Sequence, residues 1–188
     1  MGRRRVGTDR LSVPALAYFW GEDAFGIEHA ARSHANELSN EAGQPIEIWH
    51  TSTDDTESDD TNGSSGAGRR RAKILQQLDQ RSSTGTLFGS GTLAVVRQPG
   101  ALIREQTSRD QLVAIIDRVA LGNAICFLDL IPSGGKGPAQ GGLLRDAVAM
   151  REGRVKEYAA PTRERMEGWI ANRAKELGAT LAPGAAQL

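Results

Sequence analysis

Residues 15–27 read ALAYFWGEDAFGI, and this stretch decides the fold of the chain. Its first part, residues 15–20, is apolar and aromatic, which is typical of a buried strand. Gly21 to Asp23 then turn the chain, and Asp23 is placed to cap a helix that ends at Gly43. A strand that turns at once into a helix with an apolar stripe indicates an α/β domain.

The same alternation of strand and helix continues along the sequence. Apolar or alternating runs predict further strands at 46–49, 92–97, 125–130 and 155–158. Helical patterns fill the intervals: 69–80, a segment from a capping box at Ser108 and Gln111 up to Gly122, 143–151 and 162–177. This spacing predicts βαβ units and a mostly parallel sheet with helices on both faces.

The 188 residues suit one domain, or one domain plus a fragment of a second. Residues 1–14 are predicted to be a flexible basic tail, and residues 15–160 the α/β domain. Within that domain, residues 51–68 hold almost no apolar side chains, so they are interpreted as a mobile insertion. Pro161 marks a predicted boundary, and 161–188 are expected to begin a small helical domain of a longer protein.

The charges of the chain balance, with 23 Lys and Arg against 23 Asp and Glu. This neutral total gives no sign of a chain-wide basic face for nucleic acid. The single cysteine, Cys126, excludes an internal disulfide and fits a reducing compartment. No apolar run approaches the roughly 20 residues that cross a bilayer, and no signal core follows the basic start. We therefore expect a cytoplasmic protein without a membrane partner.

A nucleotide-hydrolysing domain of this class needs a phosphate cradle after its first strand, with the pattern G-x-x-x-x-G-K-[ST]. Gly21 and Gly26 keep the glycine spacing, but Ile27 replaces the lysine and Glu28 replaces the hydroxyl. The two carboxylates at 22–23 would also repel phosphate. The nucleotide site is therefore predicted to be degenerate, and no cofactor is expected.

Two further segments share features with nucleotide sites. The Gly-rich loop around Lys136 lacks the second-glycine spacing and has Gly137 where Ser or Thr is needed, which favours a surface loop. Asp129 ends an apolar strand where a magnesium-binding aspartate could lie. No carboxylate follows it to position a water, and this favours a structural or vestigial role.

The histidines and the cysteine show no spacing typical of a metal site. His29 and His34 are five residues apart, so they fall on different faces of their helix. Cys126 lies inside an apolar strand and is interpreted as a small buried hydrophobe. No metal site and no catalytic residue are predicted.

Two large apolar residues, Leu87 and Phe88, lie in a loop between Gly85 and Gly89, directly before a predicted strand. One interpretation is that both side chains fold back on the core as a plug. The other is that they protrude as a hydrophobic anchor for a partner's pocket, a use that the flanking glycines suit. The residues alone leave both interpretations open.

The order of these features resembles the N-terminal part of the delta subunit of bacterial DNA polymerase III, a clamp-loader family. The resemblance rests on the opening strand with Gly21-Glu22-Asp23, and on Leu87-Phe88-Gly89 running into a strand that ends at Arg97. The later elements agree in order, namely 125–130, 155–158 and the helix with Trp169-Ile170. The long insertion at 51–68 and the loop around Lys136 depart from the family's pattern.

The resemblance implies the fold of the AAA+ ATPases without their ATP site, followed by the start of the family's lid domain. It implies a subunit with no catalysis of its own within a DNA-directed DNA polymerase, which is a nucleotidyltransferase. In the family, delta binds and opens the beta sliding clamp during DNA replication. The family fills the clamp pocket with an adjacent Leu and Phe, which match Leu87 and Phe88, and the helix at 69–80 matches a surface near the clamp. Further implied partners are the ATPase subunits, delta-prime and, indirectly through the holoenzyme, DNA.

Two rival functions belong to other classes. An active P-loop ATPase or kinase would bind nucleotide, and the missing lysine at Ile27 argues against it. A DNA-binding module would use the arginine runs at 3–5 and 69–71, and it would bind any duplex with strong salt dependence.

Overall fold

The computed structural model describes residues 13–53, 65–85, 91–132, 141–182 and 184–186. Within these residues, strands and helices alternate as the sequence predicts. In chain order they are β1 (Leu16–Gly21), α1 (Ala24–Ala42), β2 (Glu47–Ser52), α2 (Ser65–Ser83), β3 (Thr92–Arg97), the 3₁₀ helix η1 (Pro99–Ile103), α3 (Gln106–Asp117), β4 (Ala124–Leu130), α4 (Gly141–Ala149), β5 (Arg154–Tyr158) and α5 (Arg163–Glu176).

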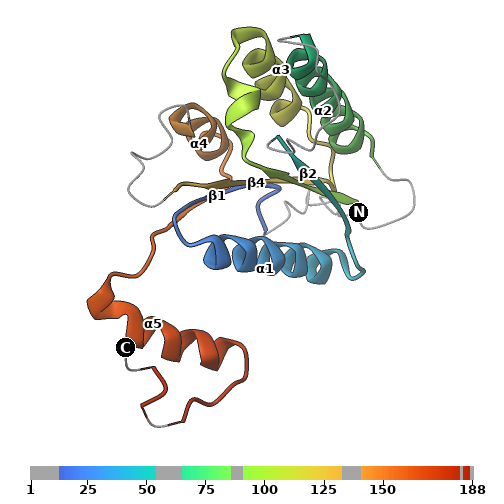
Figure 1. Cartoon of the computed structure of the whole chain (residues 1–188). Helices are drawn as coiled ribbons and strands as arrows, with labels where there is room; N and C mark the ends of the chain where they lie inside the picture. Colours follow the sequence, from blue (N-terminus) through green and yellow to red (C-terminus); the bar gives the residue numbers. More distant parts are fainter. Residues whose placement is uncertain (1–12, 54–64, 86–90, 133–140, 183, 187–188) are drawn as a thin grey trace, which may run out of the picture.

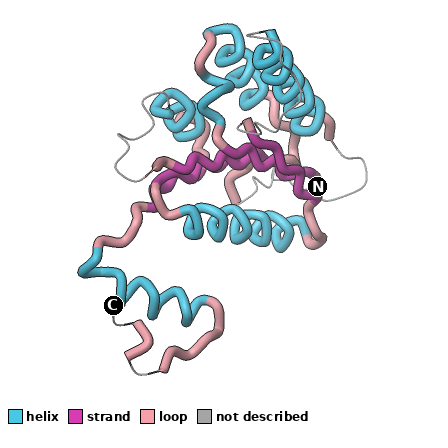
Figure 2. The backbone as a smooth tube through the Cα atoms, viewed as in Figure 1, coloured by secondary structure: helices cyan, strands magenta, loops and turns pink. Residues whose placement is uncertain are grey.

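The described strands form one parallel sheet in the order β2-β3-β4-β1-β5. Helix α1 covers one face, while α2, α3 and α4 cover the other (Figures 1 and 2). The predicted α/β class, the parallel pairing and the two covered faces are therefore confirmed. Because β1 lies between β4 and β5, the β1–α1 connection is flanked by the carboxyl ends of two other strands.

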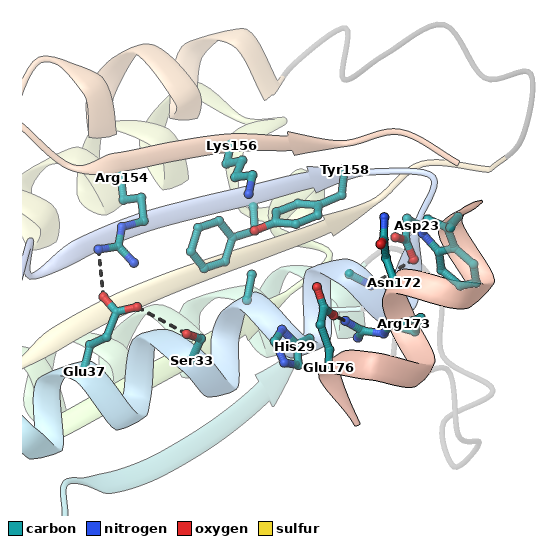
Figure 3. A pocket seen from close by; sticks show the side chains of 14 residues that line it. Asp23, His29, Ser33, Glu37, Arg154, Lys156, Tyr158, Asn172, Arg173 and Glu176 are labelled. Atoms are coloured by element: carbon teal, nitrogen blue, oxygen red, sulfur yellow. Dashed lines mark hydrogen bonds and ion pairs between the residues drawn. The ribbon is translucent and has the colours of Figure 1, made fainter. Parts of the chain in front are cut away.

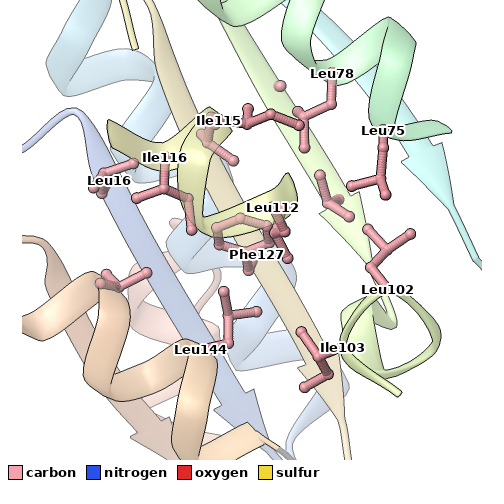
Figure 4. Packing of buried hydrophobic residues seen from close by; sticks show 14 of the residues in the cluster. Leu16, Leu75, Leu78, Leu102, Ile103, Leu112, Ile115, Ile116, Phe127 and Leu144 are labelled. Carbon is pink, nitrogen blue, oxygen red and sulfur yellow. The ribbon is translucent and has the colours of Figure 1, made fainter. Parts of the chain in front are cut away.

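Side chains of β1 alternate between two cores. Leu16 and Tyr18 join the core beneath α2, α3 and α4, opposite Ile125 and Phe127 of β4 (Figure 4). The intervening Ala17 and Phe19 pack on the other face, against α1. A strand that is buried on both faces has no polar side, which explains the continuous apolar run in the sequence.

The first helix begins and ends where the sequence predicts. Asp23 is its N-cap, and the Asp23 carboxylate accepts a hydrogen bond from the amide of Gly26 at 2.8 Å. Gly43 ends the helix with a φ of 69°, a left-handed conformation that glycine adopts without steric cost. Both ends of α1 are therefore specified by local sequence.

Regular structure extends into both ends of the predicted insertion at 51–68. β2 continues through Ser52, and α2 begins at Ser65. Ile74, Leu75 and Leu78 bury the middle of α2 in the core, and a helix held there extends readily because each added residue contributes a further hydrogen bond. Residues 54–64, the centre of the predicted insertion, lie outside the described residues.

The capping box predicted at Ser108 is wrong. Helix α3 begins earlier, after the N-cap Glu105, and Ser108 is buried within it. The carboxylate of Glu105 makes no capping bond because it pairs with Arg71 of α2. The helix also ends at Asp117, before the predicted stop at Gly122.

Helix α5 lies apart from the sheet (Figure 1). The chain reaches it through residues 159–162, and α5 contributes no buried residue. That a separate domain begins at Pro161 stays a prediction. No helix among the described residues is long and apolar enough to cross a membrane.

One buried polar side chain stands out in the core against α1. His34 is fully buried, and neither ring nitrogen has a hydrogen-bond partner among the described residues. Its ring meets Phe19 edge-on, with centroids 6.2 Å apart. Burial lowers the pKa of His34 to about 4, the nearby Arg154 adds to this, and Glu37 opposes it.

We predict that acidification destabilises the fold through His34. The pKa of this side chain is lower in the folded chain than in the unfolded chain, so its contribution is complete above pH 6.5 and is lost as the pH falls toward 4. Between pH 7.5 and 5.0 the loss from this group is about 2 kcal/mol. Denaturant titration of the parent and of His34→Leu measures it, because the variant lacks this slope. An equal slope in both proteins would contradict the prediction, and the half-buried His29→Asn on the same helix is the matched control.

Candidate functional site

The β1–α1 connection occupies the place of the phosphate cradle, but it is only two residues long. β1 ends at Gly21 and α1 begins at Ala24, so Gly26 lies in the first turn of the helix. The amide of Gly26, which a cradle would offer to phosphate, already donates to the Asp23 carboxylate. The carboxylate thus takes the position at the helix N-terminus that favours an anion.

Contacts with β5 hold this connection closed. The amide of Asp23 donates to the Tyr158 carbonyl at 2.9 Å. Gly21 has a φ of 134°, and a Cβ added there would lie 2.2 Å from the same Tyr158 oxygen. Only glycine fits this approach, which brings the end of β1 directly against the backbone of β5.

The two positions after Gly26 confirm that the pattern has been replaced. Ile27, in place of the lysine, is buried in the core against α1. Glu28, in place of the hydroxyl, accepts two hydrogen bonds of 2.9 Å from the guanidinium of Arg97 at the end of β3. The same guanidinium lies 3.0 Å from Nδ1 of His50, and burial together with Arg97 lowers the pKa of His50.

These residues do not fit a magnesium nucleotide. A phosphate cradle needs free backbone amides, a lysine and a hydroxyl that binds the metal. Here a carboxylate fills the helix N-terminus, an apolar side chain replaces the lysine, and an arginine neutralises Glu28. A guanidinium beside Glu28 would also repel a divalent cation.

Asp129 has the structural environment that the sequence favours. Its carboxylate accepts a hydrogen bond from the hydroxyl of Tyr18 at 2.8 Å. Burial and this carboxylate raise the pKa of Tyr18, so the hydroxyl stays protonated and donates. The other segment with nucleotide-like features, the loop around Lys136, lies outside the described residues.

The predicted anchor residues Leu87 and Phe88 also lie outside the described residues. The structure does define the two ends of their loop. α2 ends at Ser83 on one side, and β3 begins at Thr92 on the other. Both ends meet at the buried side chain of Asn123, in the turn between α3 and β4.

Asn123 ties the loop ends together with its whole amide group. Its oxygen accepts from the Thr92 amide at 2.9 Å, while its nitrogen lies 2.9–3.1 Å from three carbonyls around the end of α2, those of Arg81, Ser82 and Thr84. A Cβ added to Gly91 would lie 2.0 Å from the Gly122 carbonyl oxygen. The turn that contains Asn123 therefore also packs closely against Gly91, directly before β3. Leu87 and Phe88 are therefore carried by a loop with a fixed base.

This role of Asn123 is not evident from the sequence. The only available signal is a polar residue placed directly before the most apolar strand, after Gly122. Such a residue is ordinarily assigned to the turn itself. Its partners come from residues about 30 to 40 positions earlier, and only the folded chain brings them together.

Of the two arginine runs in the DNA-binding alternative, one lies among the described residues. Arg69 and Arg70 are exposed at the start of α2, while Arg71 pairs with Glu105. The run at 3–5 lies outside the described residues. Cys126 is fully buried in β4, as expected for a small hydrophobe, and burial raises the pKa of its thiol.

A cavity of about 610 Å³ lies between α1, β5 and α5 (Figure 3). Its walls include Glu37 of α1, which pairs with Arg154 of β5 at 2.8 Å, and Trp169 of α5. The hydroxyl of Ser33 also donates to Glu37, at 3.2 Å. The sequence did not predict this cavity, because its walls come from three elements that are distant along the chain.

Two solved structures have a similar fold. AMPPCP-bound DnaA from Aquifex aeolicus matches with a TM-score of 0.50 and 14% identity, covering 95% of this chain and 51% of that one. Domain III of the Thermotoga maritima replication initiation protein DnaA matches with a TM-score of 0.51 and 10% identity, covering 92% and 66%. This chain thus spans about half of the first and just under two thirds of the second.

The likeness establishes the fold. The chain has the α/β architecture of AAA+ P-loop NTPase-like domains, as the resemblance implied. Identities of this size show the fold alone. No protein-family model and no curated protein matches the sequence.

We predict that Asn123 determines the stability of the loop base. Asn123→Ala leaves buried amide and carbonyl groups without partners, so the free energy of unfolding should fall by about 1–3 kcal/mol. Hydrogen exchange at the Thr92 amide should accelerate, because this amide donates to Asn123. Denaturant unfolding and exchange NMR measure both effects. The exposed Asn40→Ala is the matched control, and an unchanged Thr92 exchange rate would contradict the role of Asn123.

Proposed function

We propose that this chain is the clamp-binding part of a clamp-loader delta subunit, which acts in DNA replication without hydrolysing ATP. In this proposal Leu87 and Phe88 insert into the hydrophobic pocket of a beta sliding clamp. Two features taken together support the proposal. An AAA+-like domain whose phosphate cradle is closed by Asp23 also holds the Leu87–Phe88 loop on a rigid base at Asn123.

The closed cradle favours a binding role over the rival ATPase. An ATPase of this fold needs the elements that Ile27 and Glu28 replace here. A binding role needs none of them. It needs an exposed anchor and a firm base, and the Asn123 network supplies that base.

A fixed loop base supports the proposed anchor energetically. Two large apolar side chains gain about 1.5–3 kcal/mol each when a partner buries them. Ordering a free loop during binding would cancel part of this gain. Because Asn123 ties the loop's ends before any partner binds, less of the loop remains to be ordered.

The proposal also gives a physical account of clamp opening. A ligand shifts a conformational equilibrium only by its difference in affinity for the two states. The chain must therefore bind an opened or strained ring more tightly than a closed ring. Under this proposal, energy from ATP enters through other loader subunits, which would control access to the Leu87–Phe88 loop.

We predict that the double variant Leu87→Ala/Phe88→Ala loses at least about 100-fold in affinity for the clamp, because both anchors are removed. Isothermal titration calorimetry of the full chain against a bacterial beta clamp measures the effect. The variant should keep the circular dichroism and unfolding midpoint of the parent if the two side chains protrude. Loss of stability together with unchanged clamp affinity would instead favour the core plug.

The matched control for this experiment is Met150→Ala. Met150 is 83% exposed after α4, so its truncation removes a large apolar side chain from a different part of the surface. Its affinity for the clamp should equal that of the parent. If Met150→Ala weakened binding as much as the double variant, the assignment of the anchor to Leu87 and Phe88 would be wrong.

A further inference from the structure

Helix α5 is held against the rest of the molecule by few contacts. It contributes no buried residue, and the residues 159–162 that lead to it lie between β5 and α5. Its half-buried apolar side chains include Met166, Trp169 and Ile170. A helix of this kind is held in place by few interactions, so each of them carries a large share of its docking energy.

Arg173 of α5 contacts Phe25 of α1. The guanidinium carbon of Arg173 lies 3.6 Å from the centre of the Phe25 ring. Its Nη2 is also 3.5 Å from the Phe25 carbonyl, and Nη1 pairs with Glu176 on the same helix. The Arg173 side chain is only 14% exposed, although α5 is otherwise a surface helix.

The contact lies beside the closed cradle. Phe25 belongs to the first turn of α1, directly after the cap Asp23. The segment leading to α5 starts at Tyr158, whose carbonyl accepts from the Asp23 amide. α5 therefore leaves the body beside the start of α1 and returns to it at Arg173, about 15 Å further along the helix axis from Arg163.

The cavity of about 610 Å³ lies behind this contact. Asn172 and Glu176 face it from α5, and His29 and Lys156 face it from the body (Figure 3). The side of α5 that lines the cavity contains no buried residue, so the helix can move without disrupting a packed core. The volume of the cavity therefore depends on the position of the helix.

We propose that Arg173 and Phe25 form a latch that holds α5 against the first turn of α1, and that α5 exchanges between a latched and a released position. The residues 159–162 are the hinge, and Arg173 is a positioning residue. In the latched state α5 forms one wall of the cavity, and in the released state the half-buried His29 becomes more accessible. The contact between Arg173 and Phe25 thus holds α5 at the N-terminus of α1. Helix N-termini of this kind can also bind a phosphate group.

The strength of the contact suits a latch that opens. A partly desolvated cation–π pair changes an equilibrium constant by roughly 5- to 30-fold. Removal of either partner should raise the ratio of released to latched molecules by that factor. Removal of both should do no more than removal of one, because the two side chains form a single interaction.

Pulsed electron paramagnetic resonance on the full chain tests this proposal. Spin labels at Asn36→Cys on α1 and Glu167→Cys on α5 occupy exposed positions, and the fully buried Cys126 is left in place after labelling of the parent is shown to be negligible. Distances are compared among the labelled parent, Phe25→Leu, Arg173→Gln and the double variant. Arg163→Gln, an exposed arginine of the same helix, is the matched control.

The expected result is a dominant latched distance in the parent and in Arg163→Gln. Phe25→Leu and Arg173→Gln should both shift population to longer distances, and the double variant should match the single ones. Unchanged distances in both single variants, or additive shifts in the double variant, would overturn the proposal. Neither residue belongs to the two cores, so circular dichroism should be unchanged. If Arg173→Gln nevertheless fails to fold, Arg173→Lys replaces it, since lysine keeps the charge but lacks the planar group that stacks on Phe25.

Discussion

The hydrogen bond from the Gly26 amide to the Asp23 carboxylate caps the first helix of this molecule, and the rest of the site depends on it. It closes the start of α1 two residues after β1 ends, and the Asp23 amide anchors the same turn to the end of β5. The carboxylate satisfies a helix terminus that would otherwise attract an external anion. One side chain therefore caps α1 and also occupies the place of the phosphate cradle of the fold. Glu28 and Arg97 complete the change by pairing with each other.

Because the phosphate cradle is closed, the candidate functional features lie elsewhere on the molecule. On one side, Asn123 holds the ends of the loop that carries Leu87 and Phe88. At a separate position, Arg173 of α5 lies against Phe25 of α1, beside the cavity that α5 helps to line. We propose that both features serve the binding of other proteins, with energy supplied from elsewhere.

The sequence predicted the parts of the fold that depend on local patterns. β3 matches its predicted range, and α1 has the predicted cap at Asp23 and stop at Gly43, because apolar runs, caps and glycines act over a few residues. The prediction failed where a distant partner decides the outcome. Ser108 looks like an N-cap, yet the entry to α3 is set by Glu105, which pairs with Arg71. Asn123 and the contact between Arg173 and Phe25 were missed for the same reason, since their partners are 31 or more residues away.

We propose that this AAA+-like domain binds a clamp and does so without nucleotide. The most direct measurement is a calorimetric titration of the chain into a bacterial beta sliding clamp, carried out with and without millimolar MgATP. We expect saturable binding with the same dissociation constant in both conditions, because Asp23, Ile27 and Glu28 leave no place for the nucleotide. Absence of binding by the folded chain would contradict the proposed partner. Binding that changes with MgATP would contradict the closed cradle.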